Sequence, residues 1–323
     1  MLEKRPEKPR LSIVIPCYNE EQGLPSTFDT LLKLIKEMII KGKIARDSYI
    51  CAVDDGSKDG TWEVISKYHR KNPLHIKGVK FIRNYGNQKA IMAGLEESRK
   101  VGCDCAVSID ADLQQDENAI FTFLEKYKAG AEIVCGIRTD RATDSFFKKT
   151  TAMMFYKVMN LLGVKIPPNH SDYRLVSKKA LEILERYTET HLFLRGFFHE
   201  VGLKTEYVKF NVKSRKFGTS KFSVYQLFAL ALNGITSFSI IPLRIIAILG
   251  FLTVIGSVCL GLETVYEKYI LHITPPGWAT VVILLALFGG LQIFCLGIIG
   301  EYIGQVYSEV KARPRYILDE ELR

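Results

Sequence analysis

Glycine-rich phosphate-binding motifs are missing from this 323-residue sequence. It contains no G-x-G-x-x-G dinucleotide fingerprint and no G-x-x-x-x-G-K-[ST] P-loop. Zinc-site patterns are missing as well, because Cys103 and Cys105 have no second Cys or His pair at zinc spacing and the six histidines show no paired spacing. The sequence therefore gives no support to a dinucleotide-dependent enzyme, a P-loop nucleotidase or a structural zinc domain.

The charged lead-in at residues 1–10 has no apolar core after it, so we expect no signal peptide. The seven cysteines are an odd number, and five lie in or beside apolar runs before residue 140, which predicts reduced, buried thiols. With 47% hydrophobic and 24% charged residues, the chain can bury a full core. The net charge of +9 favours a negatively charged partner, namely nucleic acid, anionic lipid or a phosphorylated substrate.

Short apolar runs alternate with segments of helical spacing over the first 140 residues or so. This alternation predicts an α/β fold with a parallel sheet that helices cover on both faces. We expect strands at 11–16, 49–53, 79–82, 105–109 and 132–136, with helices at 21–41, 61–70, 87–100 and 117–128.

Polar residues follow every one of these predicted strands. In an open parallel sheet, ligands bind beyond the carboxyl ends of the strands. The sequence therefore predicts a polar-ligand site at this rim, formed by Tyr18, Asn19 and Glu20, by Asp54 and Asp55, by Asn84, Tyr85 and Gly86, by Asp110 and Asp112, and by Arg138 and Arg141.

Asp110 and Asp112 indicate a metal site within this rim. Side chains at i and i+2 of an extended chain project to the same side, and two carboxylates so placed repel each other unless a cation lies between them. Mg²⁺ and Mn²⁺ prefer such oxygen ligands and leave positions open for phosphates. The alternative is a solvated turn between a strand and a helix, with Asp as the helix cap.

The motifs of the rim resemble those of inverting family 2 glycosyltransferases with the GT-A (Rossmann-like) fold. The closer resemblance is to the polyprenyl-phosphate glycosyltransferases, such as dolichyl-phosphate mannose synthase and the bactoprenol glucosyltransferases. It rests on Pro16–Glu20, Val53–Thr61, Arg83–Gly86 and Asp110–Gln114, followed in the family's order by Asn169–Leu175, Arg215–Lys221 and two apolar C-terminal segments. The chain departs from the family at Gln115 and Asp116, where Pro-rich residues are usual, and at Asn87, where Lys or His is frequent.

The resemblance implies a role for each group of site residues. The nucleotide-sugar would be bound by Pro16, Tyr18, Asn19, Glu20, Asp54, Asp55, Asp110 and Arg138, with Asp55 on the base or ribose. Asp110, Asp112 and Gln114 would hold Mg²⁺ or Mn²⁺ on the diphosphate. The acceptor phosphate would meet Arg141, Arg215, Ser220 and Lys221, and the catalytic residues would be Asp112 and Asp172, the latter as a base or as a positioning group.

Each of these assignments has a plainer alternative. Arg138 and Arg141 could form a solvated helix start beside Asp140 and Asp144. The Arg215–Lys221 cluster could be a basic loop at a membrane surface, alone or together with phosphate binding. Asp172 could cap a turn.

The C-terminal third predicts two transmembrane helices. Ile245–Leu262 and Ile273–Gly300 carry no charge, and about 20 residues cross a hydrocarbon core. Residues 222–243 are uncharged but contain Ser, Thr, Asn and Gln, which favours amphipathic helices at the interface. Two spans also place the basic residues on one face, as the positive-inside rule requires. The predicted order is a lead-in (1–10), a cytoplasmic catalytic domain (11–221), interfacial helices (222–243), a transmembrane pair (244–304) and a cytoplasmic tail (305–323) of a multi-pass cell-membrane protein.

The predicted activity is inverting transfer of a sugar, with UDP-glucose favoured as the donor, to a polyprenyl monophosphate at the cytoplasmic membrane face. One alternative is a processive polysaccharide synthase, which should carry Gln-x-x-Arg-Trp, but Trp62 and Trp278 lie in other contexts. Another is a non-catalytic membrane scaffold of the same fold, which should have lost the acids of the rim. Nucleic acid is not expected as a partner, because the basic residues cluster near the membrane segments without interleaved aromatics. Homo-oligomerisation is left open.

Overall fold

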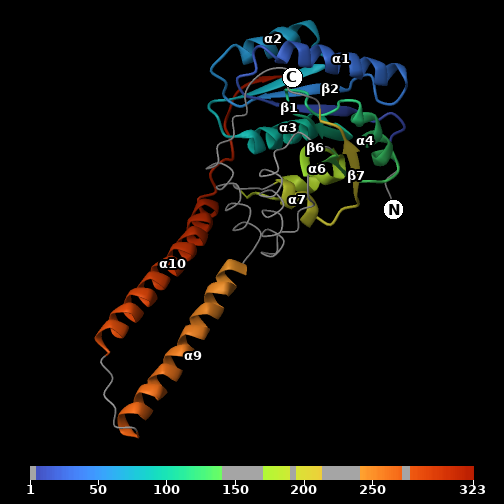
Figure 1. The fold of residues 1–323 in the computed structure, drawn as a ribbon. Helices are drawn as coiled ribbons and strands as arrows, with labels where there is room; N and C mark the ends of the chain where they lie inside the picture. Colours follow the sequence, from blue (N-terminus) through green and yellow to red (C-terminus); the bar gives the residue numbers. More distant parts are fainter. Residues whose placement is uncertain (1–4, 140–169, 190–193, 213–240, 271–276) are drawn as a thin grey trace.

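The computed structural model describes residues 5–139, 170–189, 194–212, 241–270 and 277–323. Within these residues, one eight-stranded sheet has the order β7-β5-β6-β4-β1-β2-β3-β8 (Figure 1). The strands are β1 (Leu11–Cys17), β2 (Tyr49–Asp54), β3 (Ile76–Phe81), β4 (Cys105–Ser108), β5 (Ile133–Arg138), β6 (His170–Ser177), β7 (Thr205–Phe210) and β8 (Leu318–Leu322).

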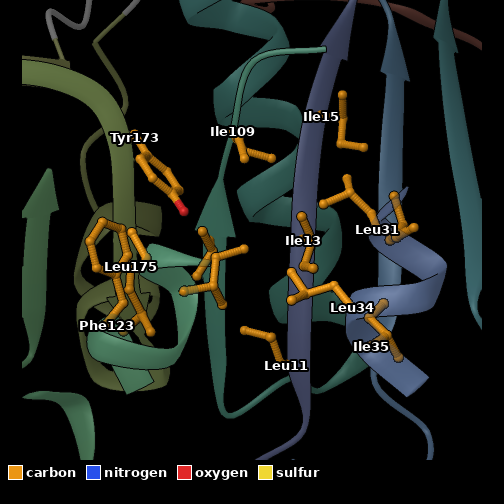
Figure 2. Packing of buried hydrophobic residues seen from close by; sticks show 14 of the residues in the cluster. Leu11, Ile13, Ile15, Leu31, Leu34, Ile35, Ile109, Phe123, Tyr173 and Leu175 are labelled. Carbon is orange, nitrogen blue, oxygen red and sulfur yellow. The ribbon is translucent and has the colours of Figure 1, made fainter. Parts of the chain in front are cut away.

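Helices cover both faces of this sheet because its central strands are apolar on both sides. In β1, Leu11, Ile13 and Ile15 belong to one core (Figure 2). Val14 belongs to the other core. The first core is covered by α1 (Leu24–Ile40), α2 (Thr61–Lys71) and α4 (Ala119–Lys128). The second is covered by α3 (Asn87–Val101), α6 (Lys178–Glu185) and α7 (Leu194–Glu200).

The predicted α/β alternation is confirmed up to β5, but the prediction of a parallel sheet was wrong for two strands. β6 runs antiparallel to both β4 and β5, and β8 runs antiparallel to β3. The other described pairs, β1 with β2 and β4, β2 with β3, and β5 with β7, are parallel. The sheet is therefore mixed, because β6 and β8 enter it after the regular βαβ run has ended.

Five of the cysteines, Cys17, Cys51, Cys103, Cys105 and Cys135, are buried free thiols, as predicted. Burial raises the pKa of Cys51 and of Cys103 to about 12. At neutral pH these groups therefore stay protonated and behave as small apolar side chains.

Two long apolar helices, α9 (Ile241–Tyr269) and α10 (Trp278–Val310), lie side by side and extend away from the sheet (Figure 1). Each contains a stretch long and apolar enough to cross a membrane, Ile241–Leu260 and Leu287–Val310, and neither stretch is buried within the protein. The helices agree with the two predicted spans, although α10 continues ten residues past Gly300. Residues 222–240 of the predicted interfacial segment lie outside the described residues.

The segment after α10 returns to the eight-stranded sheet, which the expectation of a simple tail did not include. β8 pairs with the outer edge of β3, and the Tyr316 ring stacks on Phe81 with 4.9 Å between ring centroids. Arg315 donates to the Glu189 carbonyl oxygen at 2.8 Å and pairs with the Glu96 carboxylate at 3.2 Å. The second apolar helix is therefore tied to the sheet by an ordered segment.

Candidate active site

The turns after β1 and β2 are joined to each other by hydrogen bonds. Asn19 has a positive φ of 52°, its N–H donates to Ser57 Oγ at 2.9 Å, and its Oδ1 accepts the Lys58 N–H at 2.9 Å. The Glu20 N–H donates to Thr61 Oγ1 at 2.9 Å. These bonds bring the two predicted nucleotide-binding turns together as one surface.

Asp55 connects this surface to the loop after β3. Its carboxylate accepts the Tyr85 N–H at 2.6 Å and the Gly86 N–H at 2.9 Å. Burial raises the pKa of Asp55 to about 6, in spite of these two bonds, which lower it. Gly56 lets the loops approach, because its φ is +64° and an added Cβ would lie 2.3 Å from the Arg83 carbonyl carbon.

Asp54 lies beside Asp55 and is fully buried. One carboxylate oxygen accepts the Ser57 N–H at 3.0 Å, while the other, Oδ2, has no partner among the residues that the structure describes. Burial raises the pKa of this carboxyl group. The Asp54 carboxylate therefore stabilises the turn that contains it, whereas the Asp55 carboxylate binds the loop after β3.

Asp110 and Asp112 lie on a tight turn, so the assumption of an extended chain was wrong here. The Leu113 N–H donates to the Asp110 carbonyl oxygen at 3.2 Å, and Leu113 has a φ of 47°. Thr27 of α1 donates its hydroxyl to the Ala111 carbonyl oxygen at 2.6 Å. The two acids therefore lie on one turn of the chain, and strand alternation does not place them.

Gln115 is the residue that holds Asp110 in this turn. Its buried side chain accepts the Asp110 N–H at 3.0 Å and donates to the Asp110 carboxylate at 2.6 Å. The same Nε2 lies 3.4 Å from the Ser171 hydroxyl on β6. Gln114, which the sequence analysis placed at the metal, donates its backbone N–H to Asp112 Oδ1 at 3.2 Å.

β6 places Asp172 at the same end of the sheet. The Ser108 hydroxyl at the end of β4 donates to the Asp172 carbonyl oxygen at 2.5 Å. The Asp172 carboxylate accepts from Arg174 at 3.1 Å on Oδ1 and from Gln88 at 3.3 Å on Oδ2. Asp172 is therefore part of a strand, and the alternative of a turn cap was wrong.

Arg174 fixes Asp172 from the protein interior. Its side chain is fully buried, donates to the Leu194 carbonyl oxygen at 3.1 Å and lies over the Phe198 ring at 4.7 Å. Burying a guanidinium is costly unless it is paired and hydrogen-bonded, which these contacts achieve. The carboxylate of Asp172 consequently has a rigid support on one side.

The described structure therefore brings only some of the predicted site residues together. The Pro16–Glu20 turn, the two acidic turns and Asp172 meet at one end of the sheet. Arg138 is exposed at the end of β5, where its backbone is in register with Phe210 of β7. Arg141, Arg215, Ser220 and Lys221 lie outside the described residues.

Asp110 and Asp112 offer the oxygen donors that a hard divalent cation prefers. Within the described parts of the chain, no group of three or more His, Cys, Asp or Glu residues could enclose a metal. Such a pair suits an ion that takes most of its ligands from substrate phosphates and water, as Mg²⁺ commonly does. The donor set therefore fits the predicted cation.

The family model described as "Glycosyl transferase family 2" matches residues 12–184, from the second residue of β1 to the next-to-last residue of α6. The chain belongs to this family. Its α/β architecture is the GT-A fold, so the predicted family and fold are confirmed.

Full-length relatives extend this similarity through the two apolar helices. The chain is 45% identical to "Uncharacterized glycosyltransferase YkoT" of Bacillus subtilis, over 98% of this chain and 93% of the relative. It is 34% identical to the bactoprenol glucosyl transferase of Shigella phage SfX, over 96% of this chain and 98% of the relative. The structure of mannosyltransferase PcManGT from Pyrobaculum calidifontis, in complex with GDP-Man and Mn²⁺, is 15% identical and aligns with a TM-score of 0.44, covering 95% of this chain and 88% of that one.

Sequence reasoning missed two side chains of this glycosyltransferase that contact its site acids. Gln115 is visible in the sequence as a departure from the usual Pro-rich turn, but nothing in its spacing indicates that its amide turns back to Asp110. Gln88 lies within a helical pattern whose polar positions look solvated. Asp172 contacts Gln88 because β6 lies in the sheet, and no periodicity in the sequence predicted β6.

Proposed function

We propose that this glycosyltransferase moves one sugar from a nucleotide-sugar, with UDP-glucose the favoured donor, to a polyprenyl monophosphate. The observation that carries the proposal is the meeting of Asp55, the Asp110–Asp112 turn and Asp172 at one end of a sheet that is tied to two apolar helices. The relation to bactoprenol glucosyl transferases over nearly the whole chain supports a lipid-linked acceptor.

The donor would lie across the loops that Asp55 joins. We assign the base or ribose to Asp55 and to the turn that contains Pro16, Tyr18, Asn19 and Glu20, with Asp54 as its internal support. Arg138 would meet the donor phosphates. Asp110 and Asp112, with Gln114, would hold Mg²⁺ or Mn²⁺, which neutralises charge on the leaving diphosphate when it is bound.

The acceptor supplies its own nucleophile. A phosphate monoester has a second pKa near 6, so it is mostly a dianion at neutral pH. One of its oxygens would form the new bond to the anomeric carbon, while the bond from that carbon to the diphosphate breaks and the nucleoside diphosphate leaves with the electron pair. A single displacement inverts the anomeric centre. Asp172, held by Arg174 and Gln88, would orient the acceptor or serve as a base.

The acceptor phosphate would be met by Arg141, Arg215, Ser220 and Lys221, which precede the first apolar helix. These residues lie outside the described part of the chain, so this assignment rests on the sequence pattern and the family. Cationic and hydroxyl side chains suit a lipid phosphate at a membrane surface. The boundaries proposed for the catalytic domain (11–221), the interfacial helices (222–243) and the transmembrane pair (244–304) follow from the same pattern.

The sheet itself supports a two-span topology. β7 precedes α9 and β8 follows α10, and both strands belong to one sheet. A chain that leaves a domain and returns to it must cross the membrane an even number of times. The pair α9 and α10 meets this condition, whereas a third span in 222–243 would not. Arg244, Lys311 and Arg313 at the ends of the helix pair favour the cytoplasm for the catalytic domain.

The decisive experiment is a transfer assay. Purified protein, undecaprenyl phosphate and Mg²⁺ or Mn²⁺ are incubated with each of several radiolabelled nucleotide-sugars, and label is sought in the organic phase. We expect one labelled lipid that carries a single sugar. A polymeric product would favour a processive synthase, and no transfer from any donor would favour a scaffold without catalysis.

A further inference from the structure

Gln88, on the first turn of α3, contacts Asp172 from outside β6, whereas Arg174 contacts it from within that strand. Its Nε2 donates to Asp172 Oδ2 at 3.3 Å. The orientation of the amide follows from chemistry, because exchanging its oxygen and nitrogen would set a carbonyl oxygen against a carboxylate oxygen, two groups that only accept. The amide oxygen, Oε1, must therefore serve another partner.

That oxygen is buried, and no residue in the described ranges donates a hydrogen bond to it. Buried acceptors are nearly always paired, and the exceptions in native proteins call for a functional or structural reason. For Gln88 a functional reason is indicated, because the nitrogen of the same amide contacts Asp172, an acid of the candidate site.

Gln88 also lies between the two halves of the site. It follows Gly86 by two residues, and the Gly86 N–H is held by Asp55, which we assign to the nucleoside. On its other side is Asp172, which we assign to the acceptor. The transferred sugar must lie between a nucleoside and an acceptor phosphate in any direct displacement.

We infer that Gln88 is a positioning residue that orients Asp172 through its amide N–H and accepts a hydrogen bond from a hydroxyl of the transferred sugar through Oε1. The inference rests on the proposed transfer reaction. Among the reactants, a dianionic phosphate has no proton to donate, and the nucleoside lies beside Asp55. The sugar hydroxyls remain as donors that a neutral carbonyl oxygen can bind.

The first test replaces Gln88 by Met, which has similar length but neither donates nor accepts strongly. We expect Gln88→Met to lower kcat about 10- to 100-fold, the usual effect of losing a hydrogen bond to a charged group. The affinity for UDP should stay within about twofold, since UDP lacks the transferred sugar. Asn87→Ala is the matched control, because Asn87 is exposed on the same helical turn and should retain wild-type kcat. Wild-type kcat in Gln88→Met would overturn the positioning role.

The second test uses UDP-glucose lacking one hydroxyl, at C2, C3, C4 or C6. If Oε1 accepts from a sugar hydroxyl, one of these donors should lose about tenfold or more in kcat/KM with the wild-type enzyme and little further with Gln88→Met. Equal losses in the two enzymes for all four donors would overturn the sugar contact.

A third measurement separates this inference from the proposed function. The side-chain amide NMR signal of Gln88 is identified by its absence in Gln88→Met and is then followed in Asp172→Asn. We expect it to shift, because its carboxylate partner is lost. A protein that transfers no sugar to lipid but shows this shift would refute the proposed function alone, whereas an unmoved signal would overturn the inference whatever the protein transfers.

Discussion

The Gln115 side chain bonds Asp110 at two points, accepting its N–H at 3.0 Å and donating to its carboxylate at 2.6 Å. Such two-point support fixes both the position and the rotation of an acid. Groups that orient a metal ligand are commonly worth 10- to 100-fold in metal affinity. If Asp110 holds the cation as proposed, Gln115 is expected to raise the affinity for the cation without touching it.

Gln115→Leu tests this expectation. The variant keeps the approximate volume of the side chain and removes both hydrogen bonds. We expect the affinity for UDP in the presence of Mn²⁺ to fall about tenfold or more, while the affinity for UDP with chelator changes little. Calorimetry under the two conditions makes the comparison within one protein. Equal losses with and without metal would indicate a general collapse of the turn.

Asp112 and Asp172 should separate in the same binding experiment. If Asp112 is a cation ligand, Asp112→Asn removes charge where the cation binds, so metal-dependent UDP affinity and activity should fall together. Asp172→Asn should instead leave UDP affinity nearly intact and lower kcat. Calorimetry of UDP with Mn²⁺ measures both. A comparable loss of binding in the two variants would assign Asp172 to the metal site as well.

The raised pKa of Asp55 predicts a pH dependence of nucleoside binding. Its pKa is about 6 instead of 3.8, so the carboxyl is charged above pH 6 and becomes neutral below it. A neutral carboxyl has given one acceptor oxygen a proton, so it supports the Tyr85 and Gly86 N–H groups less well. We expect the affinity for uridine to fall as the pH drops from 7 to 5. Uridine has no phosphate that would itself titrate in this range.

NMR titration with uridine at several pH values measures this dependence, and Asp55→Asn is the control that should be weak and pH-independent. The pH dependence of the free energy of unfolding has the opposite sign to that of the affinity for uridine. Between about pH 4 and 6 the folded protein binds more protons at Asp55 than the unfolded chain, so the contribution of Asp55 to the free energy of unfolding decreases as pH rises. Uridine affinity that stays constant from pH 5 to 7 would contradict the role given to Asp55.

Much of this site followed from the sequence, and the part that did not has a physical explanation. β1 to β5 are apolar runs with helical spacing between them, so their periodicity shows in the sequence. β6 begins with His170, Ser171 and Asp172 and contains the buried Arg174, so its composition hides a central strand. Asp172 and Arg174 both belong to a motif of the family, but the contact between Asp172 and Gln88 could not be predicted, because Gln88 comes from α3.

β8 shows a different limit of sequence reasoning. Its residues, Leu-Asp-Glu-Glu-Leu, are acidic and have no strand periodicity. They form a strand because β3 offers an open edge and Lys80 pairs with Glu320 at 3.1 Å and with Asp319 at 3.4 Å. β7 could have been predicted from the sequence, because Val208 and Phe210 alternate with exposed residues as in a half-buried strand.

The topology can be tested at two engineered cysteines, at Asp319 and at Thr274, in a background where Cys259 and Cys295 are replaced. Asp319 lies in β8, and Thr274 lies between α9 and α10, outside the described residues. We expect a membrane-impermeant thiol reagent added to intact cells to label position 274 but not position 319. If both positions are labelled in intact cells, or if neither is labelled before the cells are opened, the two-span model is wrong.

Tyr316 should stabilise the domain that contains the sheet, although it follows the two apolar helices in the chain. Its ring stacks on Phe81, which also contacts the edge of the Tyr85 ring with 5.6 Å between ring centroids, and its hydroxyl donates to Glu96. Tyr316→Ala should lower the free energy of unfolding by about 1 to 3 kcal/mol. Thermal unfolding followed by near-UV circular dichroism in detergent should show a fall of several degrees. Tyr307→Ala, at an exposed aromatic residue of α10, should change little.

The place of β8 in the sheet also orders events during biosynthesis. Ribosomes make β3 early, and its outer edge has no strand beside it until α9 and α10 have been translated. An open strand edge invites pairing with other chains. A chain whose synthesis stops before β8 would keep that edge open, so aggregation of such truncated chains is expected to begin at β3.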